Sequence, residues 1–169
     1  ILCTDKTGTL TQDHIVLKFP LDLLGREREE VLEFAYLNST YQSGLKNLLD
    51  VAILEHRDLA TKLSLQQRYR KIDEIPFDFV RRRMSVVIEE EGHHHELICK
   101  GAVEEIAQIC DQVRLDGQTI GLDAQLRKQL HQLNHDLNED GLRVIAVAYK
   151  ELAPDQKVYS VADERSLIL

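Results

Sequence analysis

A carboxylate followed by a short glycine turn opens the sequence and carries its clearest chemistry. The run reads Asp5-Lys6-Thr7-Gly8-Thr9-Leu10-Thr11, directly after a short apolar, strand-like start. A carboxylate at the carboxyl end of a strand can attack a phosphoryl group as a nucleophile. The amides of the turn and the Thr hydroxyls can hold the oxygens of the transferred phosphate. The run therefore predicts Asp5 as a phosphoryl acceptor.

The residue two positions after the nucleophile decides how long an aspartyl phosphate lasts. In aspartate-based phosphatases a second Asp at this position acts as general acid and base and hydrolyses the intermediate. Thr7 occupies the position here and has no such proton chemistry. An aspartyl phosphate on Asp5 is therefore expected to persist, as in an enzyme that stores energy in a phosphoenzyme.

Three further segments follow Asp5 in a fixed order. They are Phe77-Asp78-Phe79-Val80-Arg81-Arg82-Arg83-Met84-Ser85, then Lys100-Gly101-Ala102, then Gly141-Leu142-Arg143-Val144. In this order and rough spacing, the four motifs resemble those of the P-type ATPases, the cation-pumping membrane enzymes. The resemblance covers about residues 1–149.

The resemblance implies a nucleotide-binding domain that holds ATP, as Mg-ATP, or ADP. Phe77 matches the residue that stacks on adenine, an interaction worth about 1–3 kcal/mol. Arg82 and Arg143 match basic residues that reach the phosphates, and Lys100 and Gly101 match a segment that lines the pocket. Gly101 has no side chain, so the backbone can approach a ligand closely.

Two positions depart from the family pattern. Asp50 stands where the family offers a Glu to the adenine amino group, and its side chain is one methylene shorter, which disfavours a direct contact. Val103 replaces the Pro that usually follows Lys-Gly-Ala. Segments 44–50 and 77–83 look most like the bacterial magnesium-transporting branch, which implies magnesium as the transported cation.

Periodicity predicts an α+β domain with a mostly antiparallel sheet flanked by helices. Expected helices are Arg26–Asn38, Leu45–Leu59, Gly101–Cys110 and Asp123–Asp140. Expected strands are His14–Phe19, Lys71–Phe79, Met84–Glu90, Glu96–Lys100, Gln112–Leu115, Thr119–Gly121 and Arg143–Tyr149. Phe79 is expected to pack into the core.

Composition and motif position indicate the partners, compartment and domain organisation of the chain. The net charge of −8 disfavours a nucleic-acid partner, since such proteins need positive surface to displace counterions. Three Cys without a CxxC pair favour a reducing compartment. We predict residues 1–11 as a remnant of a phosphorylation domain and 12–169 as the nucleotide-binding domain. The resemblance implies a cytoplasmic domain of a membrane protein whose partners are its phosphorylation, actuator and transmembrane parts.

Other readings of the sequence remain open. Three consecutive histidines, His93-His94-His95, point in different directions along an extended chain, so we predict a solvated hairpin tip and no metal site. No Gly-Asp-Gly-x-x-Asn-Asp run follows Asp5, so binding of ATP without turnover is expected from this chain. The alternatives are a haloacid-dehalogenase-type phosphatase fragment with a cap domain, and a non-catalytic interaction module.

Overall fold

A seven-stranded sheet frames the part of the chain that the computed structural model describes, residues 15–44, 46–55, 68–90 and 94–169. The order across it is β1-β2-β3-β6-β7-β4-β5. Only β4 and β7 run parallel; the other neighbours are antiparallel. The strands are β1 (Tyr69–Asp78), β2 (Arg83–Glu90), β3 (His95–Gly101), β4 (Cys110–Leu115), β5 (Gln118–Gly121), β6 (Ala146–Leu152) and β7 (Leu167–Ile168). The expected α+β class and mostly antiparallel sheet are confirmed.

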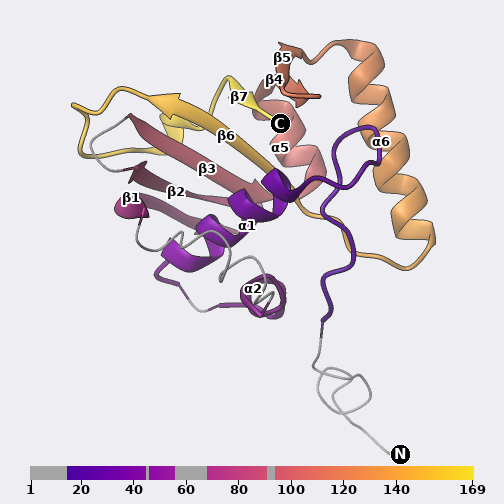
Figure 1. Ribbon diagram of the computed structural model, residues 1–169, viewed down its shortest axis with the longest axis horizontal. Helices are drawn as coiled ribbons and strands as arrows, with labels where there is room; N and C mark the ends of the chain where they lie inside the picture. The colour runs from indigo at the N-terminus through magenta and orange to yellow at the C-terminus, as the bar shows by residue number, and fades with distance from the viewer. Residues whose placement is uncertain (1–14, 45, 56–67, 91–93) are drawn as a thin grey trace, which may run out of the picture.

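Helices cover both faces of this sheet. The first face carries α1 (Glu29–Tyr41) and α2 (Leu48–Leu54), and the second α5 (Val103–Ile109) and α6 (Ala124–Glu139). Side chains of β3 alternate between them, with Ile98 in the core under α1 and Leu97 in the core under α5. Figure 1 shows α1 lying across the middle strands and α6 apart from it. A single 3-10 turn, η1 (Val161–Asp163), precedes β7.

Local signals explain where several elements begin and end. The Asp123 carboxylate accepts a hydrogen bond from the Leu126 amide at 2.8 Å and caps α6. Gly141 adopts a φ of +81° just after α6. Asn47 and Asp50 form a reciprocal capping box at the start of α2. No helix among the described residues is long and apolar enough to cross a membrane.

Several element boundaries differ from the sequence prediction, and two of the shifted starts have a local explanation. The first helix begins at Glu29 and not at Arg26, because the Asp22 carboxylate accepts hydrogen bonds from the side chains of Arg26 and Arg28 ahead of it. Strand β6 begins at Ala146 and not at Arg143, where its pairing with Gly101 starts. Both shifts amount to three residues and leave the predicted elements in place.

The strand predicted at His14–Phe19 is wrong for the described residues 15–19, which form no strand. Val16 and Phe19 are about half-exposed, whereas Leu17 packs against the core under α1. The alternation therefore reflects side-chain packing without backbone pairing. His14, like residues 1–13, lies outside the described residues, so the boundary predicted at residue 12 stays a prediction.

The histidine run is not wholly a solvated tip. His95 is buried at the start of β3, and its Nδ1 lies 2.6 Å from the Tyr159 hydroxyl. The prediction of solvation is wrong for this residue because the segment before η1 covers it. His94 is exposed, and His93 lies outside the described residues.

Candidate functional site

One end of the sheet gathers the predicted nucleotide motifs. Asp78 of β1 pairs with Arg83 of β2, Arg83 with Gly101 of β3, and Gly101 with Ala146 of β6. These pairings follow one another across the sheet, so the four strand ends share one edge. Residues within one position of that edge include Phe77, Arg82, Lys100 and Gly101, and Arg143 lies three residues before β6.

Two phenylalanines stand exposed at this edge. Phe77 is 51% exposed and Phe79 is 88% exposed, and their rings meet edge to face with centroids 5.3 Å apart. The prediction that Phe79 packs into the core is wrong, because β1 ends at Asp78 and Phe79 already belongs to the turn. Strand alternation stops there, and the edge carries two accessible aromatic rings.

The three consecutive arginines that follow have different partners. Arg82, with a side chain 54% exposed, donates to Glu105 of α5 at 2.5 Å, which raises its pKa. Arg81 and Arg83 both donate to Glu164, at 2.7 and 2.8 Å. Only Arg82 therefore presents its guanidinium outward from this turn to any great extent.

The backbone of the β1–β2 turn packs directly against Gly101. A Cβ atom at position 101 would lie 2.5 Å from the Arg83 Cβ and 2.6 Å from the Arg82 carbonyl oxygen. The neighbouring Ala102 amide donates to that same carbonyl at 3.1 Å. Absence of a side chain at Gly101 thus lets the β1–β2 turn pack on the end of β3, a reason for glycine that the sequence did not indicate.

Lys100 is buried in a polar cluster between β3 and the first two helices. Its Nζ atom donates to the Ser39 hydroxyl at 2.7 Å and forms an ion pair with Asp50. Ser39 in turn donates to the Asp50 carboxylate at 2.9 Å. The second oxygen of that carboxylate accepts from the Asn47 amide at 3.1 Å. Asp50, expected not to reach adenine, is thus engaged within the chain.

Opposing effects set the protonation of this pair. Burial acts to raise the pKa of Asp50, but attraction and hydrogen bonding to Lys100 outweigh it, and the pKa lies below its usual value. Burial lowers the pKa of Lys100, while Asp50 acts to raise it. An ionised pair follows, with both charges compensated inside the domain.

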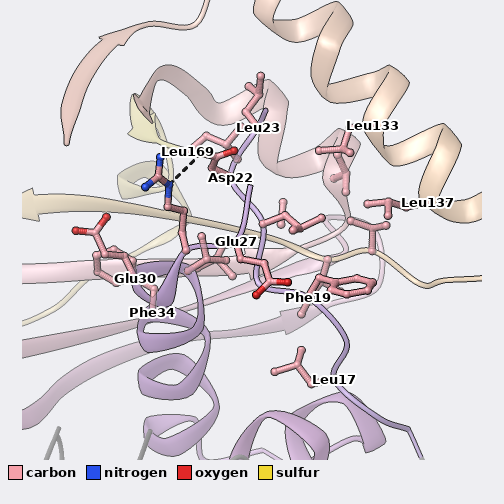
Figure 2. A pocket seen from close by; sticks show the side chains of 18 of the residues that line it. Leu17, Phe19, Asp22, Leu23, Glu27, Glu30, Phe34, Leu133, Leu137 and Leu169 are labelled. Carbon is pink, nitrogen blue, oxygen red and sulfur yellow. Dashed lines mark hydrogen bonds and ion pairs between the residues drawn. The ribbon is translucent and has the colours of Figure 1, made fainter. Parts of the chain in front are cut away.

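A cavity lies beside the last of these motifs, Gly141–Val144, and away from the other two. It measures about 620 Å³ and is lined by apolar side chains of segment 15–23, α1, α6 and residues 142–147. Figure 2 shows Leu17, Phe19, Leu133 and Leu137 among the side chains of its wall, the last two from α6. Among the predicted site residues that the structure describes, only the exposed Arg143 lines it. We therefore place the candidate nucleotide site at the sheet edge, where the aromatic and basic groups gather.

Sequence reasoning missed three residues of this region. Ser39, Glu105 and Glu164 each bond to a motif residue or its neighbour. None lies in a motif, and their contacts span between 23 and 83 positions of sequence, so no local pattern could have revealed them. Asp5 and Thr7 lie outside the described residues, and their assignment stays a prediction.

Comparison with known proteins identifies the family of the chain. The family model for the P-type ATPase cytoplasmic domain N matches residues 43–168. The whole chain is 54% identical to a magnesium-transporting ATPase, P-type 1, of Escherichia coli K12, and 53% identical to one of Salmonella typhimurium LT2. A calcium-transporting ATPase 1 of Lactococcus lactis is 29% identical over 186 residues, again across the whole chain.

The fold and the matched motifs define a nucleotide-binding type of α+β domain. The chain belongs to the family of P-type ATPase cytoplasmic N domains. It spans 19% of the length of its magnesium-transporting relatives and 21% of the Lactococcus one. Membership of this family disfavours both the phosphatase and the non-catalytic alternatives.

Proposed function

We propose that the sheet edge binds ATP or ADP, with the adenine stacked on Phe77. The supporting observation is a half-exposed aromatic ring at the same edge as an exposed arginine and the Lys100-Gly101 strand end. Lys100 and Gly101 line the site from beneath. Arg82 and Arg143 are exposed and supply the positive charge for the phosphates.

Phosphate binding by Arg82 involves an exchange of partners. In the ligand-free domain its guanidinium is paired with Glu105. A nucleotide phosphate offers the same kind of oxygen acceptors with a larger negative charge. Stacking together with two or three exposed charge contacts, less the cost of association, gives a Kd of about 0.1 to several mM.

The parent protein proposed for this domain is a magnesium-transporting P-type ATPase. The support is that the relatives 53–54% identical over the whole chain are magnesium-transporting ATPases. In that parent, Asp5 accepts the phosphoryl group of Mg-ATP, and the domain works with phosphorylation, actuator and transmembrane parts. This chain alone binds nucleotide without hydrolysing it.

Titration of the chain with ATP, followed by amide NMR, tests the proposed site. Shifts are expected to concentrate at Phe77, Arg82 and Gly101. Amides along α6, which lines the apolar cavity, serve as the internal control. Saturating shifts confined to α6 and segment 15–23 would place the ligand in the cavity and refute the proposal. Hydrolysis that scales with protein concentration and disappears in Asp5→Asn would refute binding without turnover.

A further inference from the structure

A buried carboxylate from the far end of the chain holds the turn of the nucleotide site. The Glu164 side chain is fully buried. One of its oxygens accepts hydrogen bonds from Arg81 and Arg83, at 2.7 and 2.8 Å. The other accepts from the Ser85 hydroxyl at 2.8 Å. The segment after η1 is thereby fastened to β2 and to the turn that precedes it.

These contacts extend to the two proposed ligand residues. Besides bonding to Glu164, Arg81 donates to the carbonyl oxygen of Pro76, the residue before Phe77, at 2.9 Å. Arg82 lies between the two held arginines and adopts a φ of +46°, in the left-handed region that a side chain disfavours. The contacts of Arg81 and Arg83 with Glu164 hold the backbone on both sides of Arg82 and account for this conformation.

Glu164 also determines which arginine faces outward. The side chains of Arg81 and Arg83 are 19% and 12% exposed and share its charge, whereas Arg82 is 54% exposed. If either arginine turned to a nucleotide, the fully buried Glu164 carboxylate would lose one of its two charged donors, which is unfavourable. The phosphate role is thus left to Arg82.

We propose that Glu164 is a positioning residue for nucleotide binding. It touches no nucleotide itself. Through Arg81 and Arg83 it fixes the turn, so that the Phe77 ring and the Arg82 guanidinium are both exposed to a ligand at the same edge of the sheet. This inference rests on the proposed nucleotide site and adds to it a residue that lies in none of the four motifs.

Glu164→Gln keeps the shape of the side chain and removes its charge. Adenosine is the decisive probe because it carries no phosphate. Loss of positioning predicts that the affinity for adenosine falls about tenfold, since a single disrupted stacking contact is worth of order 1 kcal/mol or more. Faster amide exchange at Arg82, whose N–H donates to the Asp78 carbonyl, is expected in the ligand-free variant. Unchanged adenosine affinity, or a gain for ATP alone, would overturn the inference, because Glu164 would then be a mere counter-charge.

A matched control separates positioning from general stability. Glu89 is also a buried carboxylate and pairs with Arg70 on β1, but at the opposite end of β2. Glu89→Gln should leave adenosine affinity unchanged where both variants are folded. A similar loss in Glu89→Gln would reduce the role of Glu164 to stability and overturn the inference.

A second variant decides the matter if Glu164→Gln does not fold. Arg81→Gln keeps the Glu164–Arg83 pair and removes the guanidinium that joins Glu164 to the Pro76 carbonyl. Its adenosine affinity should fall severalfold, and an unchanged affinity would refute the inference. If the unmodified chain binds neither adenosine nor ATP, the proposed function fails as well. If the unmodified chain binds adenosine and Arg81→Gln binds it equally well, the inference fails and the proposed function stands.

Discussion

The charged side chains at the two ends of β3 have opposite surroundings. Glu96 and Lys100 lie four residues apart on the strand, so their side chains point to the same face. Lys100 pairs with Asp50 and Ser39 at the motif end. Glu96 at the other end pairs across the strands with Glu151 and has Glu33 and Glu90 nearby.

This difference appears in the protonation of the two groups. Burial, with repulsion from the neighbouring carboxylates, raises the pKa of Glu96 to about 7. At the other end, the pKa of Asp50 is lowered. Lys100 thus has an opposite charge beside it at the motif end of β3, whereas Glu96 has like charges beside it at the other end. Removing the Glu96 charge should therefore make the domain more stable.

The largest expected effect comes from breaking the compensated pair. Asp50→Asn leaves Lys100 buried without a counter-charge and should destabilise the domain by about 3–5 kcal/mol in chemical denaturation. Adding Lys100→Met should recover much of that loss, because the buried Lys100 charge left without a partner is then gone. Lys128→Met, at an exposed position of α6, is the control and should change stability by less than about 0.5 kcal/mol. Equal stability of Asp50→Asn and the unmodified chain would contradict the buried pair.

Acidification should weaken the same pair. Because the folded-state pKa of Asp50 lies below its unfolded value near 3.8, its contribution is complete above that pH. It is lost as the pH falls through the lower, folded value. The loss of stability in acid should therefore be smaller in the double variant, Asp50→Asn with Lys100→Met, than in the unmodified chain.

Gly101 offers the next largest effect. Gly101→Ala puts a methyl group 2.6 Å from the Arg82 carbonyl oxygen, on backbone that cannot simply turn away. Overpacking of this kind costs about 1–3 kcal/mol, measured as a fall in melting temperature. Gly121→Ala is the matched control, because a Cβ at position 121 of β5 would meet nothing within 4 Å. A loss as large in the control would show that the close approach to the turn has no special importance.

Removing the charge of Glu96, which lies beside other carboxylates, should stabilise the domain. Between pH 4.5 and about 7 the folded state holds the Glu96 proton more tightly than the unfolded state, so stability falls as the pH rises through this window. Glu96→Gln removes that slope and should add about 1–2 kcal/mol at pH 8, allowing for partial solvent screening. Near pH 4 it should add little. Glu139→Gln on exposed helix surface tests whether removing any one negative charge from a chain of net charge −8 has the same effect.

A smaller effect is expected from changing Glu105, which pairs with Arg82 and so competes with the nucleotide phosphates for it. Glu105→Gln removes the charge that holds Arg82 and should strengthen ATP binding about two- to fivefold at low salt, in line with an exposed ion pair. Adenosine affinity should not change, and the gain should shrink as salt is added. Equal gains for ATP and adenosine in calorimetric titrations would exclude competition for Arg82.

The sequence predicted the elements better than the site. The helix capped by Asp123 and the hairpin around Asp116-Gly117 follow from local rules. Phe77, Arg82 and Gly101 lie at one edge because strand ends that pair in register share it, and their role in binding stays a prediction. Burial of Lys100 and exposure of Phe79 could not be predicted, since they depend on distant Asp50 and on where β1 stops.

The central claim is that the half-exposed ring of Phe77 stacks on the base, and adenosine titration of two alanine variants tests it most directly. Phe77→Ala removes a ring that is 51% exposed, and Phe19→Ala one that is 50% exposed in the wall of the apolar cavity. The account predicts a loss of about 1–3 kcal/mol, ten- to over a hundredfold in affinity, for Phe77→Ala. It predicts no loss for Phe19→Ala. Unchanged binding by a folded Phe77→Ala, or an equal loss in Phe19→Ala, would contradict it.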